Sequence, residues 1–385
     1  MIKKSDKSMM AALALGHGVT DLYANFLPAL LPFFEDTFSL SKSMIGLLIF
    51  AITTSGSLCQ VIYGSLGDKW GRKLFLVPGP AVAAIFMSFI GVSPNFIVLL
   101  FLLLLGGMGV SAFHPHAASI TGDIAGSKRG FGISIFMTGG TVGYAAGPLV
   151  AAVLLSRLGA TKMPLTAVVG IITSYLLYKY VTTDHEIQEK RNSINILEAI
   201  KPQFRLLAIL STIVILRATV SIVFSNFISL LMDQRGRSLE FGGGIIFFFL
   251  LSISVGTLSG GYLSDRINRR TLIVLSLLLS APFFFILVHS AGVVMFACLF
   301  LSGALLGLSN PVPLTIAQEL IPEGASTASS IMMGFSWGLA GILALPFGML
   351  ADKFGGDVVP AMSIAAALPV IAALLSLFLP RKRHL

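Results

Sequence analysis

One apolar stretch near the N-terminus carries three polar residues at a spacing that suits proton chemistry. His17, Asp21 and Asn25 are each four residues apart. Four residues make about one helical turn, so the three side chains share one face of a helix over roughly residues 8–34. A carboxylate or imidazole in apolar surroundings can take up and release a proton. They are candidates for a substrate and proton site, and the pattern leaves open whether Asp21 or a histidine carries the proton.

Two further ionisable residues stand deep inside apolar segments. Arg217 is near the middle of a segment over roughly 205–232, and His114 lies in one over roughly 96–120. Arg at the centre of a membrane helix costs about 3 kcal/mol or more, so it needs a partner. Because its planar fork suits carboxylates and phosphonates, we expect Arg217 to bind an anionic group of a substrate or to pair with Asp21. A structural ion pair for Arg217 and a packing hydrogen bond for His114 are the alternatives.

Two short charged loops share one pattern and stand in register in the two halves of the chain. The first reads Gly64-Ser65-Leu66-Gly67-Asp68-Lys69-Trp70-Gly71-Arg72-Lys73, and the second reads Gly261-Tyr262-Leu263-Ser264-Asp265-Arg266-Ile267-Asn268-Arg269-Arg270. In each, an aspartate follows a glycine by four residues and precedes a basic pair. Asn25 and Asn226 repeat at a similar distance along the chain. The chain is therefore an internal repeat of two halves.

Composition places both halves in a membrane. The hydrophobic fraction is 55%, the charged fraction is 11% and the mean hydropathy is +0.91, whereas a soluble domain carries about 25% charged residues. A membrane helix needs about 20 apolar residues, and about twelve such segments fit, six on each side of a polar linker. They cover roughly 8–34, 43–65, 74–92, 96–120, 131–155, 163–181, 205–232, 242–262, 271–290, 292–314, 326–350 and 358–379.

The net charge of +9 reflects topology and not a nucleic-acid partner. With both termini in the cytoplasm, most of the 26 Lys and Arg residues fall in cytoplasmic segments, which is the positive-inside bias. Cys59 and Cys298 lie in apolar segments, so neither a disulfide nor a metal site is expected.

The paired loops, the two halves and the twelve segments together resemble the major facilitator superfamily of transporters. The resemblance covers nearly the whole chain. It implies an all-α membrane protein with twelve transmembrane helices in two pseudo-symmetric six-helix halves, residues 1–181 and 205–385, joined by a cytoplasmic linker over 182–204. Substrate in such transporters binds near the bilayer midplane, at the interface of the repeats.

The resemblance also implies a cytoplasmic gate. The expected gate residues come from both loops and are Asp68, Arg72, Lys73, Asp265 and Arg269. In the superfamily the loop aspartate approaches the start of a helix in the opposite half. We therefore expect Asp68 near Ser326-Thr327 and Asp265 near Gly130-Phe131, where a carboxylate meets free N–H groups.

Motifs in the first, fourth and fifth segments resemble particular branches of the superfamily. Gly143, Gly147 and Pro148 resemble the Gly-x-x-x-Gly-Pro element of the superfamily's proton-coupled antiporters, although Ala151 and Ala152 replace glycines of that pattern. A small-residue packing face is the alternative. The stretch Gly16-His17 to Pro32 and the run Gly109 to Pro115 are similar to the fosmidomycin-resistance-type branch, which implies export of a drug in exchange for protons.

We therefore predict a secondary active transporter of the bacterial inner membrane that exports a small organic anion or phosphonate-like drug. It is expected to act as a monomer, to need no cofactor besides a proton gradient, and not to be an enzyme. An uptake symporter or facilitator for an organic anion uses the same residues, and a non-transporting membrane sensor is a further alternative. Neither a nucleotide-binding loop nor a hydrolase motif stands in a suitable context.

Overall fold

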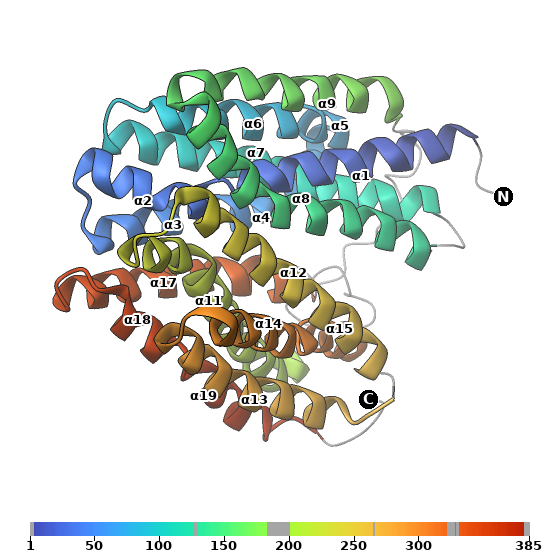
Figure 1. Ribbon diagram of the computed structural model, residues 1–385. Coiled ribbons are helices and arrows are strands. Elements are labelled where there is room, and N and C mark those ends of the chain that lie inside the picture. Colours follow the sequence, from blue (N-terminus) through green and yellow to red (C-terminus); the bar gives the residue numbers. More distant parts are fainter. Residues whose placement is uncertain are drawn as a thin grey trace. The chain divides into compact units, whose positions relative to one another are not determined.

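The computed structural model describes residues 4–125, 129–182, 201–264, 266–321, 328 and 331–380. The side chains at 4–6, 65, 68, 69, 122, 123, 125 and 129–134 also lie outside the description. Within the described part every regular element is a helix (Figure 1). This confirms the predicted all-α class.

Helices follow one another along the N-terminal part of the chain. They are α1 (Lys4–Ala24), α2 (Leu27–Phe38), α3 (Lys42–Ser57), α4 (Cys59–Trp70), α5 (Arg72–Leu76), α6 (Gly79–Phe89), α7 (Phe96–Ala125), α8 (Arg129–Leu158) and α9 (Ala167–Tyr180). The C-terminal part continues with α11 (Phe204–Gln234), α12 (Leu239–Ser264), α13 (Arg269–His289), α14 (Gly292–Leu308), α15 (Pro311–Leu320), a π-helix (Ile331–Phe335), α17 (Ser336–Lys353), α18 (Val358–Ala365) and α19 (Leu368–Ser376).

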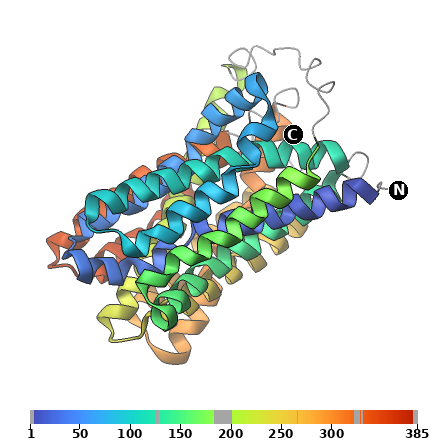
Figure 2. The same ribbon diagram turned by 90° about the horizontal axis from the view of Figure 1, so that it is seen from above.

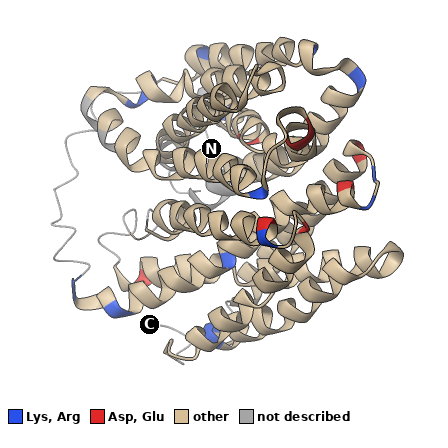
Figure 3. Ribbon diagram, turned by 90° about the vertical axis from the view of Figure 1, so that its left-hand side faces the viewer, with Lys and Arg blue, Asp and Glu red and all other residues tan. Residues whose placement is uncertain are grey.

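Eleven spans among the described residues are long and apolar enough to cross a membrane. They begin with Lys42–Gly64 and end with Val358–Ser376, so they include every expected segment except the first. Figure 3 shows how little of the ribbon carries Lys, Arg, Asp or Glu. The chain is a multi-pass membrane protein.

The first expected segment is divided between two helices. In place of one helix over 8–34, the structure has α1 and α2 with an interruption at Asn25-Phe26. Pro28 stands in the first turn of α2, where its missing N–H costs nothing. Asn25 turns away from α1 and donates its side-chain amide to the Tyr144 carbonyl of α8, 2.8 Å away.

Helices α1 and α8 lie side by side along their length (Figures 1 and 2). Glycines on α8 make this approach possible, because a Cβ on Gly143 would run into the Gly18 backbone and one on Gly147 into the Leu22 carbonyl. Fully buried Leu13 and Phe113, with Phe136, form an apolar cluster around the middle of α1. The small-residue face therefore sets how closely α8 meets the polar face of α1.

The chain forms two compact units that broadly follow the halves of the sequence. Two helix beginnings belong to the unit of the other sequence half. Leu40–Phe50, at the beginning of α3, belongs to the unit that contains α11 and α17, and Arg237–Phe247, at the beginning of α12, belongs to the unit that contains α1 and α8. The division at 1–181, 182–204 and 205–385 stays a prediction, and residues 183–200 lie outside the described part.

Candidate functional site

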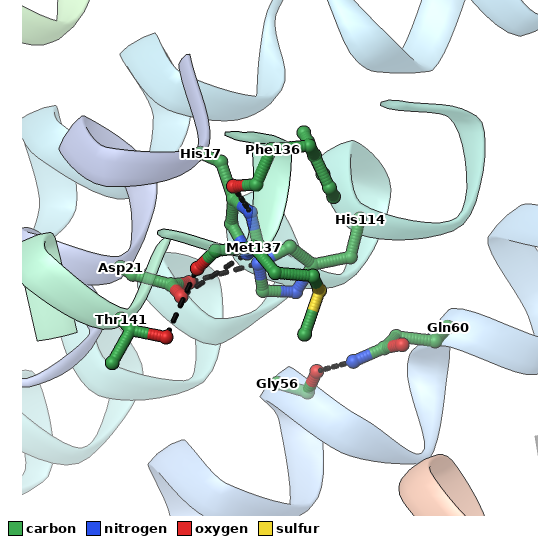
Figure 4. A network of polar contacts seen from close by, with 8 residues as sticks. All are labelled: His17, Asp21, Gly56, Gln60, His114, Phe136, Met137 and Thr141. Carbon is green, nitrogen blue, oxygen red and sulfur yellow. Dashed lines mark hydrogen bonds and ion pairs between the residues drawn. The ribbon is translucent and has the colours of Figure 1, made fainter. Parts of the chain in front are cut away.

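Three ionisable side chains meet in the first unit at one carboxylate (Figure 4). Asp21 Oδ2 lies 3.2 Å from Nε2 of His17, one turn earlier on α1, and Asp21 Oδ1 lies 2.8 Å from Nε2 of His114 on α7. The structure thus brings together three of the five residues predicted for the substrate and proton site. The two imidazole rings are 5.0 Å apart and nearly perpendicular.

The orientation of His17 is fixed from the side opposite the carboxylate. Its Nδ1 lies 2.8 Å from the backbone carbonyl oxygen of Phe136, and its ring stacks on the Phe136 ring at 4.1 Å. A Cβ on Gly140 would run into the His17 ring, so this glycine leaves the space that the ring needs. Phe136 and Gly140 were missed by sequence reasoning, because neither carries a polar side chain.

These contacts indicate where protons lie around His17. A carbonyl oxygen only accepts, so Nδ1 of His17 carries a proton toward Phe136. Nε2 of His17 faces a carboxylate, which attracts it only if a further proton lies between Nε2 and Asp21 Oδ2. Nε2 of His114 lies within hydrogen-bond distance of Oδ1, 2.8 Å away. The His17–Asp21 contact therefore holds one proton that either residue can carry, and the geometry does not choose between them.

The cluster is shielded but not sealed. The side chains of His17, Asp21 and His114 are 8%, 15% and 22% exposed. Partial exposure leaves a path for proton exchange. The apolar surroundings lower the effective dielectric constant, so the charges interact more strongly with one another. The ligand-type atoms of the three residues lie within 4.8 Å of one another, so this is also where a metal ion could be held.

Asn25, the third residue of the predicted face, has a different part. It is 3% exposed and ties the end of α1 to α8 through Tyr144. Thr141 and Gln60, which also lie near the cluster in Figure 4, bond to carbonyls of Met137 and Gly56 one turn earlier in the chain. Asp21 is thus held by its two histidines.

Arg217 lies in the second unit, on α11, and is 2% exposed. Its Nε is buried and has no hydrogen-bond partner among the residues that the structure describes. The guanidinium carbon stands 5.9 Å from the ring centre of Trp337 on α17, within the range of a cation–π contact. Trp337 was missed by sequence reasoning, because an aromatic residue in an apolar run gives no signal of its own.

The predicted gate residues are described only in part. Arg269 binds Glu319 of α15 through both terminal nitrogens, at 2.5 and 3.0 Å. Lys73 donates to the Tyr178 carbonyl at 3.0 Å, and Arg72 lies at the start of α5. The Asp68 side chain and Asp265 lie outside the described residues. So do residues 322–327 and the side chains of 129–134, which contain the helix starts that the two aspartates were predicted to contact. The aspartate latches stay predictions.

An aspartate that binds a helix start is nevertheless present elsewhere. Asp352, at the end of α17, accepts hydrogen bonds from the backbone N–H groups of Lys42 and Ser43 at 2.6 and 2.8 Å, and from the Ser43 hydroxyl. These are orphan donors in the first turn of α3. A Cβ on Gly348, one turn earlier, would run into the Lys42 carbonyl, so that glycine permits the close approach.

The signal for this contact was in the sequence. Gly348-Met349-Leu350-Ala351-Asp352-Lys353-Phe354-Gly355 repeats the spacing of Gly64-Ser65-Leu66-Gly67-Asp68-Lys69-Trp70-Gly71. Sequence reasoning missed it because this copy lacks the basic pair that ends the other two loops.

Comparison with known proteins agrees with the fold. A model of the Major Facilitator Superfamily matches residues 13–345. The chain is 27% identical to the fosmidomycin resistance protein of Escherichia coli (strain K12), covering 98% of this chain and 93% of that protein. It is 29% identical to the MFS-type transporter YfnC of Bacillus subtilis (strain 168), covering 98% and 94%.

Solved structures show the same architecture. The crystal structure of the nucleoside transporter NupG superposes with a TM-score of 0.82 at 13% identity, covering 96% of this chain and 99% of that one. That of a D-xylose-proton symporter gives a TM-score of 0.78 at 15% identity, covering 97% and 98%. At such identities the likeness concerns the fold alone.

Proposed function

Because the chain belongs to the Major Facilitator Superfamily and is therefore a transporter, we propose that it couples export of a small organic anion to proton entry by alternating access. The observation that supports this proposal is the Asp21 carboxylate held between the imidazoles of His17 and His114. An imidazole can carry a proton near neutral pH, so a carboxylate that contacts two imidazoles has partners for proton exchange.

The substrate class rests on Arg217 and on one relative. A buried guanidinium with an unpartnered Nε gains most from a carboxylate or phosphonate, which accepts two parallel hydrogen bonds. The fosmidomycin resistance protein is similar over nearly the whole chain. Fosmidomycin, a phosphonate, is therefore the first substrate to test.

Aspartate contacts at helix starts supply the proposed gate. If both termini are in the cytoplasm, as proposed, the Asp352 contact with Lys42 and Ser43 lies at the outer end of the spans Lys42–Gly64 and Ile331–Lys353. Asp68 and Asp265 are proposed to act in the same way on the cytoplasmic side. Rocking of the repeats would then break one set of contacts as it forms the other. We place the protein, as a monomer, in the bacterial inner membrane.

Inside-out membrane vesicles test the direction of coupling. In these vesicles export appears as uptake into the lumen, so an acidic lumen should drive fosmidomycin accumulation if drug leaves the cell as protons enter. The alternative, an uptake symporter, predicts that an acidic lumen drives preloaded fosmidomycin out. Vesicles that contain Asp21→Asn are the control, because the variant keeps the shape of the side chain without its charge.

A further inference from the structure

Arg217 differs from Arg269, another buried arginine of the same unit, in what holds its guanidinium. Arg269 spends both terminal nitrogens on Glu319, at 2.5 and 3.0 Å. Arg217 is held against the ring of Trp337, 5.9 Å from guanidinium carbon to ring centre. An aromatic face attracts a cation without accepting its in-plane N–H groups as a carboxylate does. Among the described residues, the terminal nitrogens of Arg217 therefore have no carboxylate partner like that of Arg269, while the Nε of each arginine is buried without a hydrogen-bond partner.

The element that carries Trp337 begins with an unusually wide turn. Ile331–Phe335 form a π-helix directly before α17, and the Ser336 hydroxyl donates to the Ile331 carbonyl at 2.8 Å. Single π turns are rare and frequently occur at functional sites. The extra residue in such a turn rotates the side chains that follow it. The π-helix thus sets the direction from which Trp337 meets Arg217.

We propose that Arg217 and Trp337 form an anion-binding subsite, in which Trp337 and the π-helix hold the guanidinium so that its N–H fork receives a phosphonate or carboxylate group. The inference rests on the proposed function in taking the ligand to be the transported organic anion. Arg217 binds the anion, and Trp337 and Ser336 are positioning residues. A buried cation without a counter-charge favours anionic ligands and disfavours cationic ones.

The chain offers a direct optical test, because it contains two tryptophans. Trp70 is 58% exposed, so Trp70→Phe should leave a folded transporter with Trp337 as its single indole fluorophore. In this background, fosmidomycin, methylphosphonate and benzoate are titrated at constant ionic strength, with choline as the cationic comparison. We expect a saturable change in Trp337 emission with at least one of the three anions and none with choline.

Variants separate binding from positioning, and melting temperature without ligand verifies that each is folded. Ligand-induced thermal shifts report affinity where Trp337 is replaced. Arg217→Lys should raise the dissociation constant about 10- to 100-fold. Trp337→Leu should raise it about tenfold, and Trp337→Phe, which keeps an aromatic face, only a few-fold. Ser336→Ala should weaken binding a few-fold, and Arg205→Lys, at an exposed position of α11, should change nothing.

Two results would overturn the inference, and they differ in what they imply. If an anion stabilises the protein while Trp337 emission and the Arg217→Lys affinity stay at their reference values, the anion binds elsewhere and the proposed function survives. If none of the three anions changes either emission or melting temperature, both the subsite and the proposed substrate class are wrong.

Discussion

Asp21 of the His17–Asp21–His114 cluster lies on α1 and Arg217 of the Arg217–Trp337 pair lies on α11, the first helices of the two sequence halves, but the two groups satisfy their charges in opposite ways. Asp21 has an imidazole at each oxygen, at 3.2 and 2.8 Å. Arg217 has an aromatic face and a buried Nε without a partner. The Asp21 carboxylate already has an imidazole at each oxygen, with which it can exchange a proton. The Arg217 guanidinium still has N–H donors for an anionic ligand. We therefore propose that the first unit carries the proton and that the second binds the substrate.

The largest effect is expected from Asp21→Asn. The amide cannot share a titrating proton with His17, so gradient-driven flux should fall to the background of empty vesicles. Substrate binding, measured by thermal shift, should persist within a few-fold, because Arg217 is unchanged. Full flux in the variant would mean that the cluster is a structural hydrogen-bond network, and the comparison between the two regions would lose its functional meaning.

Arg217→Lys should have the opposite signature. The charge remains but the fork is lost, so affinity for fosmidomycin should fall about 10- to 100-fold, equal to about 1.4–2.8 kcal/mol. Saturating substrate should restore proton-coupled flux. Transport kinetics over a range of substrate concentrations measure this, with Arg205→Lys on the same helix as the matched control. A loss of maximal flux that high substrate does not restore would place Arg217 in the coupling step.

Gly140→Ala tests whether the first region depends on its geometry. The new methyl group would meet the His17 ring and move it from Asp21 or from the Phe136 carbonyl. We expect flux to fall several-fold and stability to fall by about 1–3 kcal/mol, as for other overpacked sites. Gly244→Ala is the control, since nothing lies within 4 Å of the added Cβ. Equal effects of the two substitutions would argue against a dependence on the ring position.

The smallest effect should come from Asp352→Asn. An amide oxygen still accepts one backbone N–H of α3 but loses the charge that favours a helix start, at a cost of about 0.5–1 kcal/mol. That shifts a balanced conformational equilibrium roughly two- to fivefold. Spin-label distances between the beginning of α3 and the end of α17 should lengthen in part of the population. Asp357→Asn, which caps α18 at Val359, controls for loss of a cap alone, and an identical distance distribution in both variants would exclude a latch.

The sequence predicted those site residues for which helical periodicity, or the free-energy cost of a charge in hydrocarbon, gives a direct signal. His17 and Asp21 share a face because they are one turn apart, and an intramembrane charge such as Arg217 demanded an explanation. The fold followed from the apolar segments and from the repeated loops. His114 was predicted as a site residue from its depth, and the structure adds that it meets Asp21.

The rest depended on contacts that no local pattern encodes. Asn25, at the break between α1 and α2, donates to the Tyr144 carbonyl, and His17 is oriented by the Phe136 carbonyl; any residue type supplies such an oxygen. The π-helix before Trp337 is likewise a product of packing and not of composition. Asp352 is different, because its Gly-x-x-x-Asp-Lys spacing is visible in the sequence and could have predicted the contact.

The proton at the His17–Asp21 contact can be measured most directly as proton exchange on substrate binding. Purified transporter in weakly buffered detergent at near-neutral pH is mixed with fosmidomycin while a pH indicator is followed. Antiport through this contact predicts release of about one proton per chain, and none from Asp21→Asn although that variant still binds. Proton uptake by the wild type would instead support the symporter. The same release from Asp21→Asn, or none from a wild type that binds fosmidomycin, would contradict the account.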